Sequence, residues 1–113
     1  KGDALGTKLN SPMAPQSNDD DFMKAWASVE QLLLQYRADF ILLQCGADSI
    51  KGDPITHLEY SEKAHAHAAK RLCLLANKMC EGRLIAMGGG GYNHNNIAKA
   101  WTAVVKSMTQ TPY

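Results

Sequence analysis

The chain of 113 residues carries 12 lysines and arginines against 11 aspartates and glutamates, which gives a formal net charge of only +1 at pH 7. The charges are interspersed, without the basic block that a nucleic-acid or anionic-membrane partner would favour. This length predicts one small domain with a modest core, and the absence of a signal-peptide pattern at Lys1 and of any apolar stretch near the ~20 residues of a membrane span predicts a soluble protein.

The first part of the chain predicts a loop followed by a helix. Residues 1–17 mix glycine, proline, serine and asparagine, so we expect a loop with at most one short strand, near residues 8–10. Ser17 or Asn18 can cap a helix whose first turn holds three aspartates, where the helix dipole favours negative charge. A cation site is the alternative for these carboxylates, but successive residues of a helix point in different directions. Apolar residues at spacings of three and four predict one core face: Phe22, Trp26, Val29, Leu33 and Tyr36.

A short break at residues 37–39 leads to the first predicted strand, Phe40–Cys45. It is apolar on both faces except at Gln44, as expected of a buried strand in a parallel sheet. The loop that follows, residues 46–60, is long for a simple connection and contains Lys51-Gly-Asp-Pro54. Because long ordered loops often carry function, we expect this one to do so.

The second half repeats the plan. Ser61 is predicted to cap a helix that runs to about Cys80 and ends at Glu81-Gly82. A strand over Leu84–Met87, four glycines and a helix from near His94 follow. The buried face of the first of these helices is predicted to hold Ala64, Ala68, Leu72, Leu75 and Met79, and that of the second Ile97, Trp101, Val104, Val105 and Met108. Alternating helices and strands predict an α/β fold, a parallel sheet flanked by helices.

Each predicted strand ends at a glycine and then presents one chemically capable side chain. Asp48 follows the first strand and Tyr92 the second. If the strands are parallel neighbours, both residues emerge at the same carboxyl edge, where open α/β sheets build their sites. A carboxylate and a phenol would then share one pocket.

The four glycines before Tyr92 allow tight turns and the close approach of another group. A cavity lined by glycine is our preferred interpretation, because a simple turn would not need four of them and each costs chain entropy. A phosphate cradle at the helix N-terminus is the alternative. The spacing, however, matches neither Gly-x-Gly-x-x-Gly nor the Walker pattern.

The histidines and cysteines bear on metal chemistry. His65 and His67 lie two apart, so on a helix they cannot grip one metal together, whereas His57 and His94 lie near enough to the predicted pocket to be acid–base candidates. No Asp-x-His, His-x-x-x-His or His-His occurs, so the chain supplies at most one carboxylate to a zinc site. The three cysteines, Cys45, Cys73 and Cys80, form no Cys-x-x-Cys pair, and we expect free thiols that pack as small apolar residues in a reducing cytoplasm.

The motifs together resemble a known family. Leu43-Gln-Cys-Gly-Ala-Asp-Ser49, Gly52-Asp-Pro54 and Met87-Gly-Gly-Gly-Gly-Tyr-Asn93, followed by Trp101, resemble the carboxyl-terminal part of the histone deacetylase family. The similarity extends over nearly the whole chain and looks closest to bacterial acetoin-utilization-type and acetylpolyamine-type deacetylases. It implies the arginase/deacetylase fold, with three layers, of which residues 1–113 form the carboxyl-terminal portion in three stretches: 1–17, 18–60 and 61–113.

The resemblance also implies roles for individual residues. Asp48 corresponds to one of three zinc ligands, and Tyr92 to a tyrosine whose hydroxyl stabilises the oxyanion formed when zinc-activated water attacks the amide. Gly90 and Gly91 correspond to positions that line the substrate channel and acetate cavity, and Pro54 to its rim. The family's Asp-x-His ligands and paired catalytic histidines are not in this chain. We therefore expect the isolated chain to be inactive and to need the rest of its fold or an oligomeric partner.

Three functions follow for testing. The first is part of a zinc-dependent deacetylase that acts on acetyl-lysine, an acetylpolyamine or a related acetamide. The second is a noncatalytic fragment or interaction module that keeps the sheet and helices without the chemistry. The third is a phosphate- or nucleotide-binding α/β domain, which rests on the glycine run alone.

Overall fold

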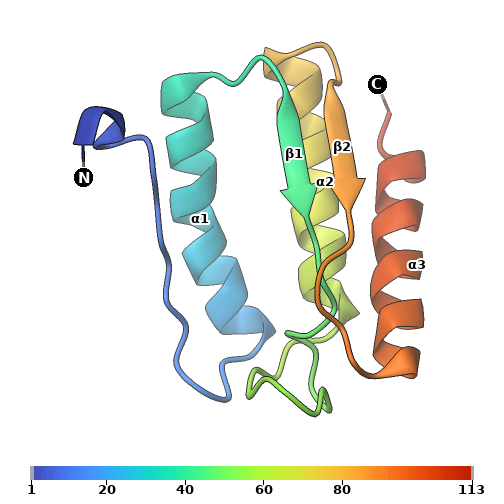
Figure 1. Ribbon diagram of the computed structural model, residues 1–113. Helices are drawn as coiled ribbons and strands as arrows, with labels where there is room; N and C mark the ends of the chain where they lie inside the picture. Colours follow the sequence, from blue (N-terminus) through green and yellow to red (C-terminus); the bar gives the residue numbers. More distant parts are fainter. Residues whose placement is uncertain (1, 113) are drawn as a thin grey trace.

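The computed structural model describes residues 2–112, and their helices and strands alternate along the chain (Figure 1). In order they are the 3-10 helix η1 (Gly2–Ala4), α1 (Asp19–Tyr36), β1 (Ile41–Gln44), α2 (Glu62–Met79), β2 (Leu84–Met87) and α3 (His94–Gln110). The strands β1 and β2 pair in parallel, with Ile41 opposite Leu84 and Gln44 opposite Met87. The α/β class with a parallel sheet is confirmed. None of the helices in the described part of the chain is long and apolar enough to span a bilayer.

Side-chain caps fix where the helices begin. Asn18 and Asp21 form a reciprocal capping box at the start of α1, each side chain accepting the other's backbone N–H at 3.1 and 2.9 Å. The neighbouring Asp19 carboxylate accepts the backbone N–H of Ser61, the residue that caps α2, at 2.8 Å. The predicted starts of these two helices are confirmed. The acidic run therefore serves helix capping and joins the N-terminal ends of α1 and α2.

All three long helices pack on one face of the sheet. Ile41 and Leu43 of β1 point into this side together with Leu84 and Ala86 of β2. Opposite them lie Trp26 of α1, several alanines and leucines of α2, and Val104 of α3. In Figure 1, α2 crosses behind the two strands, with α1 and α3 on either side of it. The small residues Ala69, Ala76 and Ala100 are fully buried, which lets the elements approach closely.

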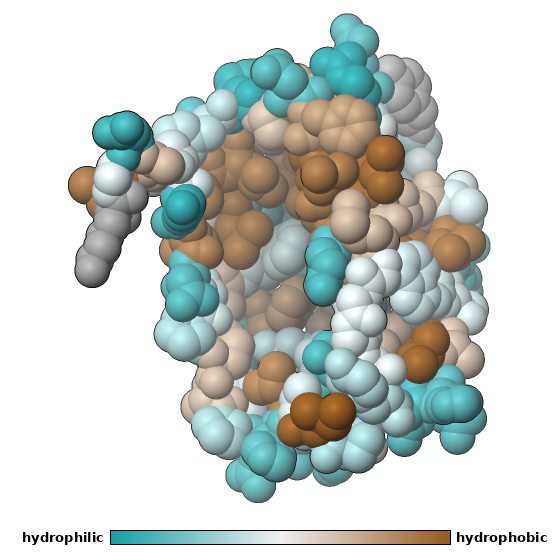
Figure 2. All heavy atoms as spheres, in the orientation of Figure 1, coloured by the Kyte–Doolittle hydropathy of each residue, from teal (hydrophilic) through white to brown (hydrophobic). Residues whose placement is uncertain are grey.

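The opposite face of the sheet is uncovered. Its side chains come from Leu42 and Gln44 of β1 and Ile85 and Met87 of β2, and Leu42 and Ile85 are 65% and 51% exposed. Hydrophobic residues gather over the strands in Figure 2, which looks onto this face. The expectation that the first strand is buried on both faces is therefore wrong for residues 2–112. A second helical layer, the third layer of the expected architecture, is not among them.

The segment before α1 forms no strand at residues 8–10, which agrees with the expectation of at most one short strand there. Two smaller expectations failed. Tyr36 is exposed in the last turn of α1, beyond the cover of α2, where its hydroxyl lies beside Gly6. Val105 is exposed because Val104, one residue earlier, occupies the inward position on α3. One residue corresponds to about 100° of rotation around a helix, enough to carry a side chain out of the core.

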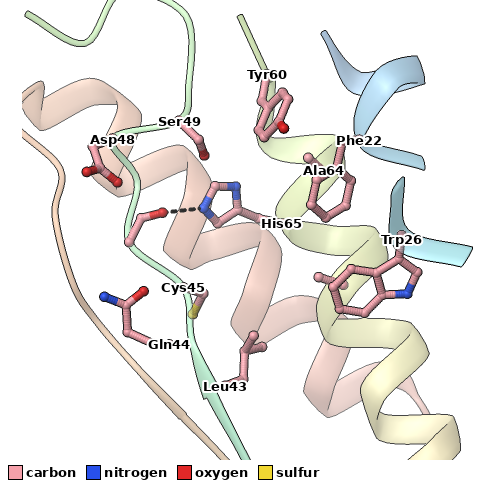
Figure 3. A pocket seen from close by; sticks show the side chains of 12 residues that line it. Phe22, Trp26, Leu43, Gln44, Cys45, Asp48, Ser49, Tyr60, Ala64 and His65 are labelled. Carbon is pink, nitrogen blue, oxygen red and sulfur yellow. Dashed lines mark hydrogen bonds between the residues drawn. The ribbon is translucent and has the colours of Figure 1, made fainter. Parts of the chain in front are cut away.

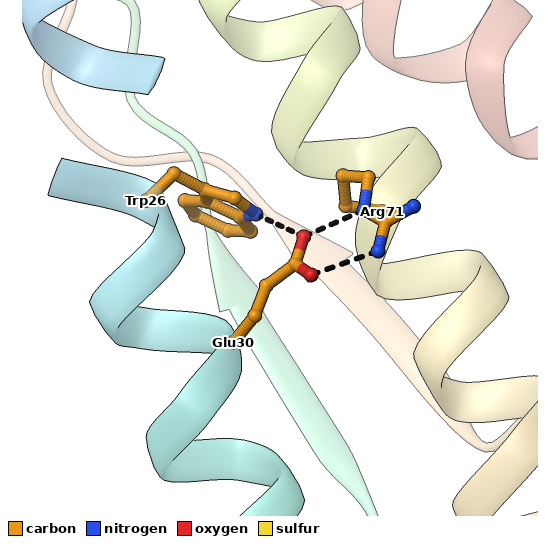
Figure 4. Close-up of polar contacts among 3 residues, drawn as sticks. All are labelled: Trp26, Glu30 and Arg71. Carbon is orange, nitrogen blue, oxygen red and sulfur yellow. Dashed lines mark hydrogen bonds and ion pairs between the residues drawn. The ribbon is translucent and has the colours of Figure 1, made fainter. Parts of the chain in front are cut away.

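A partly buried ion pair connects α1 to α2 (Figure 4). Arg71 donates to both carboxylate oxygens of Glu30, at 2.6 and 2.8 Å, and the Trp26 indole N–H donates to the same carboxylate at 2.9 Å. The hydrogen bond from Arg71 is the main reason that the pKa of Glu30 lies below its ordinary value of 4.5, although desolvation opposes the shift. The two-pronged geometry fixes how the helices pack against each other.

Candidate active site

The loops that follow β1 and β2 meet at the carboxyl edge of the sheet. Cys45 continues the ladder by donating its backbone N–H to Met87 at 2.9 Å, and Ala47 donates to the Gly90 carbonyl at 2.7 Å. A Cβ atom on Gly46 would lie only 2.7 Å from the Gly90 nitrogen. Two segments about 45 positions apart in sequence are thus in direct backbone contact, which requires glycine on at least one side.

Asp48 lies against the glycine run. A Cβ on Gly90 would sit 2.6 Å from Asp48 Cγ, and one on Gly91 would sit 3.1 Å from Ala47 Cβ. Gly91 also has φ +141°, a conformation that side chains disfavour. A Cβ on Gly88, by contrast, would meet only Trp101 Cζ2, at the ordinary contact distance of 3.6 Å. Of the expected site residues, the structure therefore brings Asp48, Gly90 and Gly91 together.

Tyr92 and Pro54 stand at the outer side of this edge. The Tyr92 side chain is 53% exposed, and Pro54 is exposed in the loop after β1. Within residues 2–112, no hydrogen bond joins the Tyr92 hydroxyl to the Asp48 carboxylate. Tyr92 is instead held by its backbone, whose N–H donates to Asp53 Oδ2 at 3.0 Å. The pocket that Asp48 lines does not include Tyr92, so the expectation that the carboxylate and the phenol share one pocket is not met there.

Asp53 is a residue whose role the sequence did not reveal. Its Oδ1 accepts the backbone N–H groups of Ile55 and Thr56 at 2.8 and 3.2 Å, while Oδ2 takes that of Tyr92. Burial raises the pKa of the Asp53 carboxyl group, but the three N–H donors outweigh it and bring the pKa below the ordinary value of 3.8. The local bonds are a common signal of aspartate in a turn. The bond to Tyr92 crosses between loops and leaves no such signal.

A pocket of about 280 Å³ opens beside Asp48, between α1, α2 and the end of β1 (Figure 3). His65, buried on α2, donates from Nε2 to the Gly46 carbonyl at 2.8 Å, since a carbonyl can only accept. Its Nδ1 is buried and has no hydrogen-bond partner among the residues that the structure describes. Aromatic rings of Phe22, Trp26 and Tyr60 line the opposite wall. A hydrogen-bond donor that enters this pocket could satisfy Nδ1.

The other three histidines do not line the pocket beside Asp48, whereas Cys45 does. His57 and His94 are exposed, and His67 packs its ring edge-on against Trp26. Burial is the main reason that the pKa of His67 lies below its ordinary value. Burial also raises the pKa of the Cys45 thiol. All three cysteines are free thiols, as expected. None of these side chains is hydrogen-bonded to Asp48 among the described residues.

Asp48 could serve as one ligand of a metal site that other residues complete. Between residues 2 and 112, no three His, Cys, Asp or Glu side chains are grouped to hold an ion. The Asp48 carboxylate, pressed against a glycine that leaves no room for a side chain, fits a single zinc ligand in its oxygen chemistry. The alternative of a phosphate site at the N-terminus of α3 is weakened, because two nearby backbone N–H groups already donate hydrogen bonds within the protein. That of Asn96 donates to the Asn93 side chain at 3.1 Å, and that of Tyr92 donates to Asp53. Fewer backbone N–H groups are therefore left to bind an anion.

Comparisons with known proteins agree with this arrangement. The family described as "Histone deacetylase domain" matches residues 1–108. The chain is 30% identical over 109 residues to the acetoin utilization protein AcuC of Bacillus subtilis (strain 168), covering 95% of this chain and 28% of that protein.

Solved structures show the same fold. The histone deacetylase Clr3 superposes with a TM-score of 0.87 at 25% identity, covering 99% of this chain and 18% of that one. The acetylpolyamine aminohydrolase from Burkholderia pseudomallei gives a TM-score of 0.81 at 17% identity, covering 98% and 31%. The chain thus spans less than a third of the length of each of these three relatives.

Proposed function

Because the chain belongs to the histone deacetylase domain family, we propose that it is the carboxyl-terminal part of a zinc-dependent deacetylase that hydrolyses an acetyl amide. The observation that carries the proposal is the contact between Asp48 and Gly90, which joins a carboxylate to a glycine-walled edge beside Tyr92. Acetyl-lysine, an acetylpolyamine or a related acetamide is the substrate class.

The chain's own residues would divide the work. Asp48 would supply one carboxylate ligand to zinc, which when bound polarises the amide carbonyl and lowers the pKa of water. The Tyr92 hydroxyl would donate a hydrogen bond to the carbonyl oxygen and hold it as negative charge develops there. Gly90 and Gly91 would keep the acetyl space clear, and Pro54 would border its entrance. The Tyr92 backbone is already anchored to Asp53, so little conformational freedom would be lost on binding.

The remaining ligands and the proton-transferring groups would come from outside residues 1–113. We propose the rest of the same fold as their source, with an oligomeric partner as the alternative. The part of the fold that supplies these groups would also cover Leu42 and Ile85 on the open face of the sheet. Free thiols suit a cytoplasmic setting, which we include in the proposal. Small or neutral acetylated molecules suit a chain with a formal net charge of +1, and neither nucleic acid nor membrane is a proposed partner.

The proposal is tested on the longer polypeptide that contains this chain, purified with zinc and assayed with acetyl-lysine peptides and acetylpolyamines. Asp48→Asn should lose zinc and activity together, because one charged ligand is gone. Tyr92→Phe should keep zinc but lower kcat by roughly 100- to 1000-fold, because an oxyanion donor is lost. Full activity of Tyr92→Phe would sink the proposed mechanism, and deacetylation by the 113-residue chain alone would refute the division of ligands.

A glycine pair provides a matched test of the channel wall. Gly90→Ala should abolish turnover, because its Cβ would collide with the Asp48 carboxylate. Gly88→Ala is the control, because its Cβ would find ordinary contact distance to Trp101. Equal activity of the two variants would show that the contact between Asp48 and Gly90 does not serve the reaction.

A further inference from the structure

Asp53 is 8% exposed and sits in the loop after β1, five residues beyond Asp48. Both of its carboxylate oxygens are used, one toward its own loop and one toward the loop after β2. A carboxylate accepts hydrogen bonds and donates none, so it can receive all three N–H groups at once. The arrangement commits a buried charge to backbone groups alone, with no basic side chain bonded to it in the described chain.

These bonds lead to both expected site residues. On one side, Asp53 Oδ2 accepts the N–H of Tyr92 itself at 3.0 Å. On the other side, Asp53 Oδ1 holds the Thr56 backbone N–H at 3.2 Å, and the Thr56 hydroxyl donates to the Asp48 carbonyl. Asp48 and Tyr92 do not bond to each other, but each is one or two hydrogen bonds away from the same carboxylate.

We propose that Asp53 is a positioning residue that sets the separation of Asp48 and Tyr92 by tying their two loops to one buried carboxylate. This inference rests on the proposed deacetylase function for its catalytic consequence. The hydrogen bonds themselves exist whether or not the protein is a deacetylase. Asp53 would act through the backbone of Tyr92 and through Thr56, the groups it is bonded to.

The need for a carboxylate follows from the directions of the three donors. An asparagine at position 53 would keep one oxygen but would turn an NH₂ group toward either Tyr92 or the Ile55–Thr56 pair. An N–H of the asparagine would then face a backbone N–H in a buried place. Two donors without an acceptor lower the stability more than the loss of one hydrogen bond does. The ionised form of Asp53 is the one present at neutral pH, since its pKa lies below the ordinary value. The three bonds are therefore charge-assisted.

The experiment compares Asp53→Asn with Asp39→Asn in the longer polypeptide. Asp39 is exposed just before β1, at the opposite end of the strand, so the control removes the same charge away from the site. We expect Asp53→Asn to lower kcat by roughly 10- to 100-fold with little change in KM or zinc content, because misplacing a catalytic group by about 1 Å has that effect. Asp39→Asn should behave as wild type.

A second readout does not depend on catalysis. Hydrogen exchange at the Tyr92 backbone N–H should be slow in the wild-type protein and faster in Asp53→Asn, while exchange inside α2 stays unchanged. If wild type does not deacetylate, the proposed function fails, but this exchange measurement still decides the role of Asp53. If Asp53→Asn does not fold, the wild-type exchange rate decides it alone.

Two results would overturn the inference. One is a kcat for Asp53→Asn within about threefold of the Asp39→Asn control, a loss of under 1 kcal/mol in the barrier. The other is a Tyr92 N–H in wild type that exchanges as fast as an unprotected amide.

Discussion

The two faces of the β1–β2 sheet have similar sequences but different surroundings. Toward the helices, Ile41 is 6% exposed and packs with Trp26 and Leu72, whereas Leu42, the next residue on the other face, is 65% exposed. Both strands alternate in this way, although both are apolar throughout except for Gln44. The difference teaches that the strands have the sequence of a doubly covered sheet, while residues 2–112 cover only one side of it.

The largest expected effect lies in the covered side. Leu72→Ala should lower the free energy of unfolding by about 2–5 kcal/mol, because it leaves a cavity among α1, α2 and β1. Leu74→Ala is the control on the same helix, where the side chain is 38% exposed against 4% for Leu72. Chemical denaturation measures both. Equal losses would mean that the helical side is not the tightly packed one.

A smaller effect is expected from the ion pair that holds α1 to α2 on the covered side. Glu30→Gln should cost about 1–2 kcal/mol, a value discounted because Arg71 is partly solvent-exposed. Glu81→Gln should cost under about 0.5 kcal/mol, since the ion pair of Glu81 with Arg83 is exposed. The measurement is the denaturant midpoint of each variant near pH 7.

The ion pair between Glu30 and Arg71 should also make the folding stability depend on pH in the acid range. The pKa of Glu30 in the folded protein lies below its ordinary value of 4.5. The contribution of the Glu30 charge to folding stability is therefore complete above pH 4.5 and is lost as the pH falls through the folded pKa. Wild type and Glu30→Gln should therefore converge in stability below about pH 4.5. A constant difference across this range would argue that the Glu30 charge plays no part.

For the 113-residue chain taken alone, the smallest effect is expected on the open face. In the 113-residue chain, Leu42→Ala should change the free energy of unfolding by less than about 0.5 kcal/mol, because the side chain is already in water. In the longer polypeptide the same substitution should cost about 2–5 kcal/mol if the proposed segment covers this face. Paired denaturation of the two lengths makes the comparison. A small cost in both would leave the face uncovered in the longer protein as well.

The expected site was predictable where a motif lies within one stretch of chain. Asp48 and the glycines follow apolar strands directly, and the parallel pairing brings them to one edge as expected. Their roles as ligand and channel wall remain predictions. Asp53 and His65 were missed as site-supporting residues because their partners, Tyr92 and Gly46, lie 39 and 19 positions away. Contacts of that kind leave no periodic pattern in the sequence.

The sequence by itself determined the order of the main helices and strands and where the first two long helices begin. Asn18 and Ser61 cap their helices through bonds made within three residues, and such local bonds are written in adjacent residue types. Only the tertiary structure decided which sheet face is covered, that Tyr36 and Val105 face solvent, and that one aspartate ties two loops together. Burial and long-range hydrogen bonds depend on what packs against a residue, and that is a property of the assembled fold.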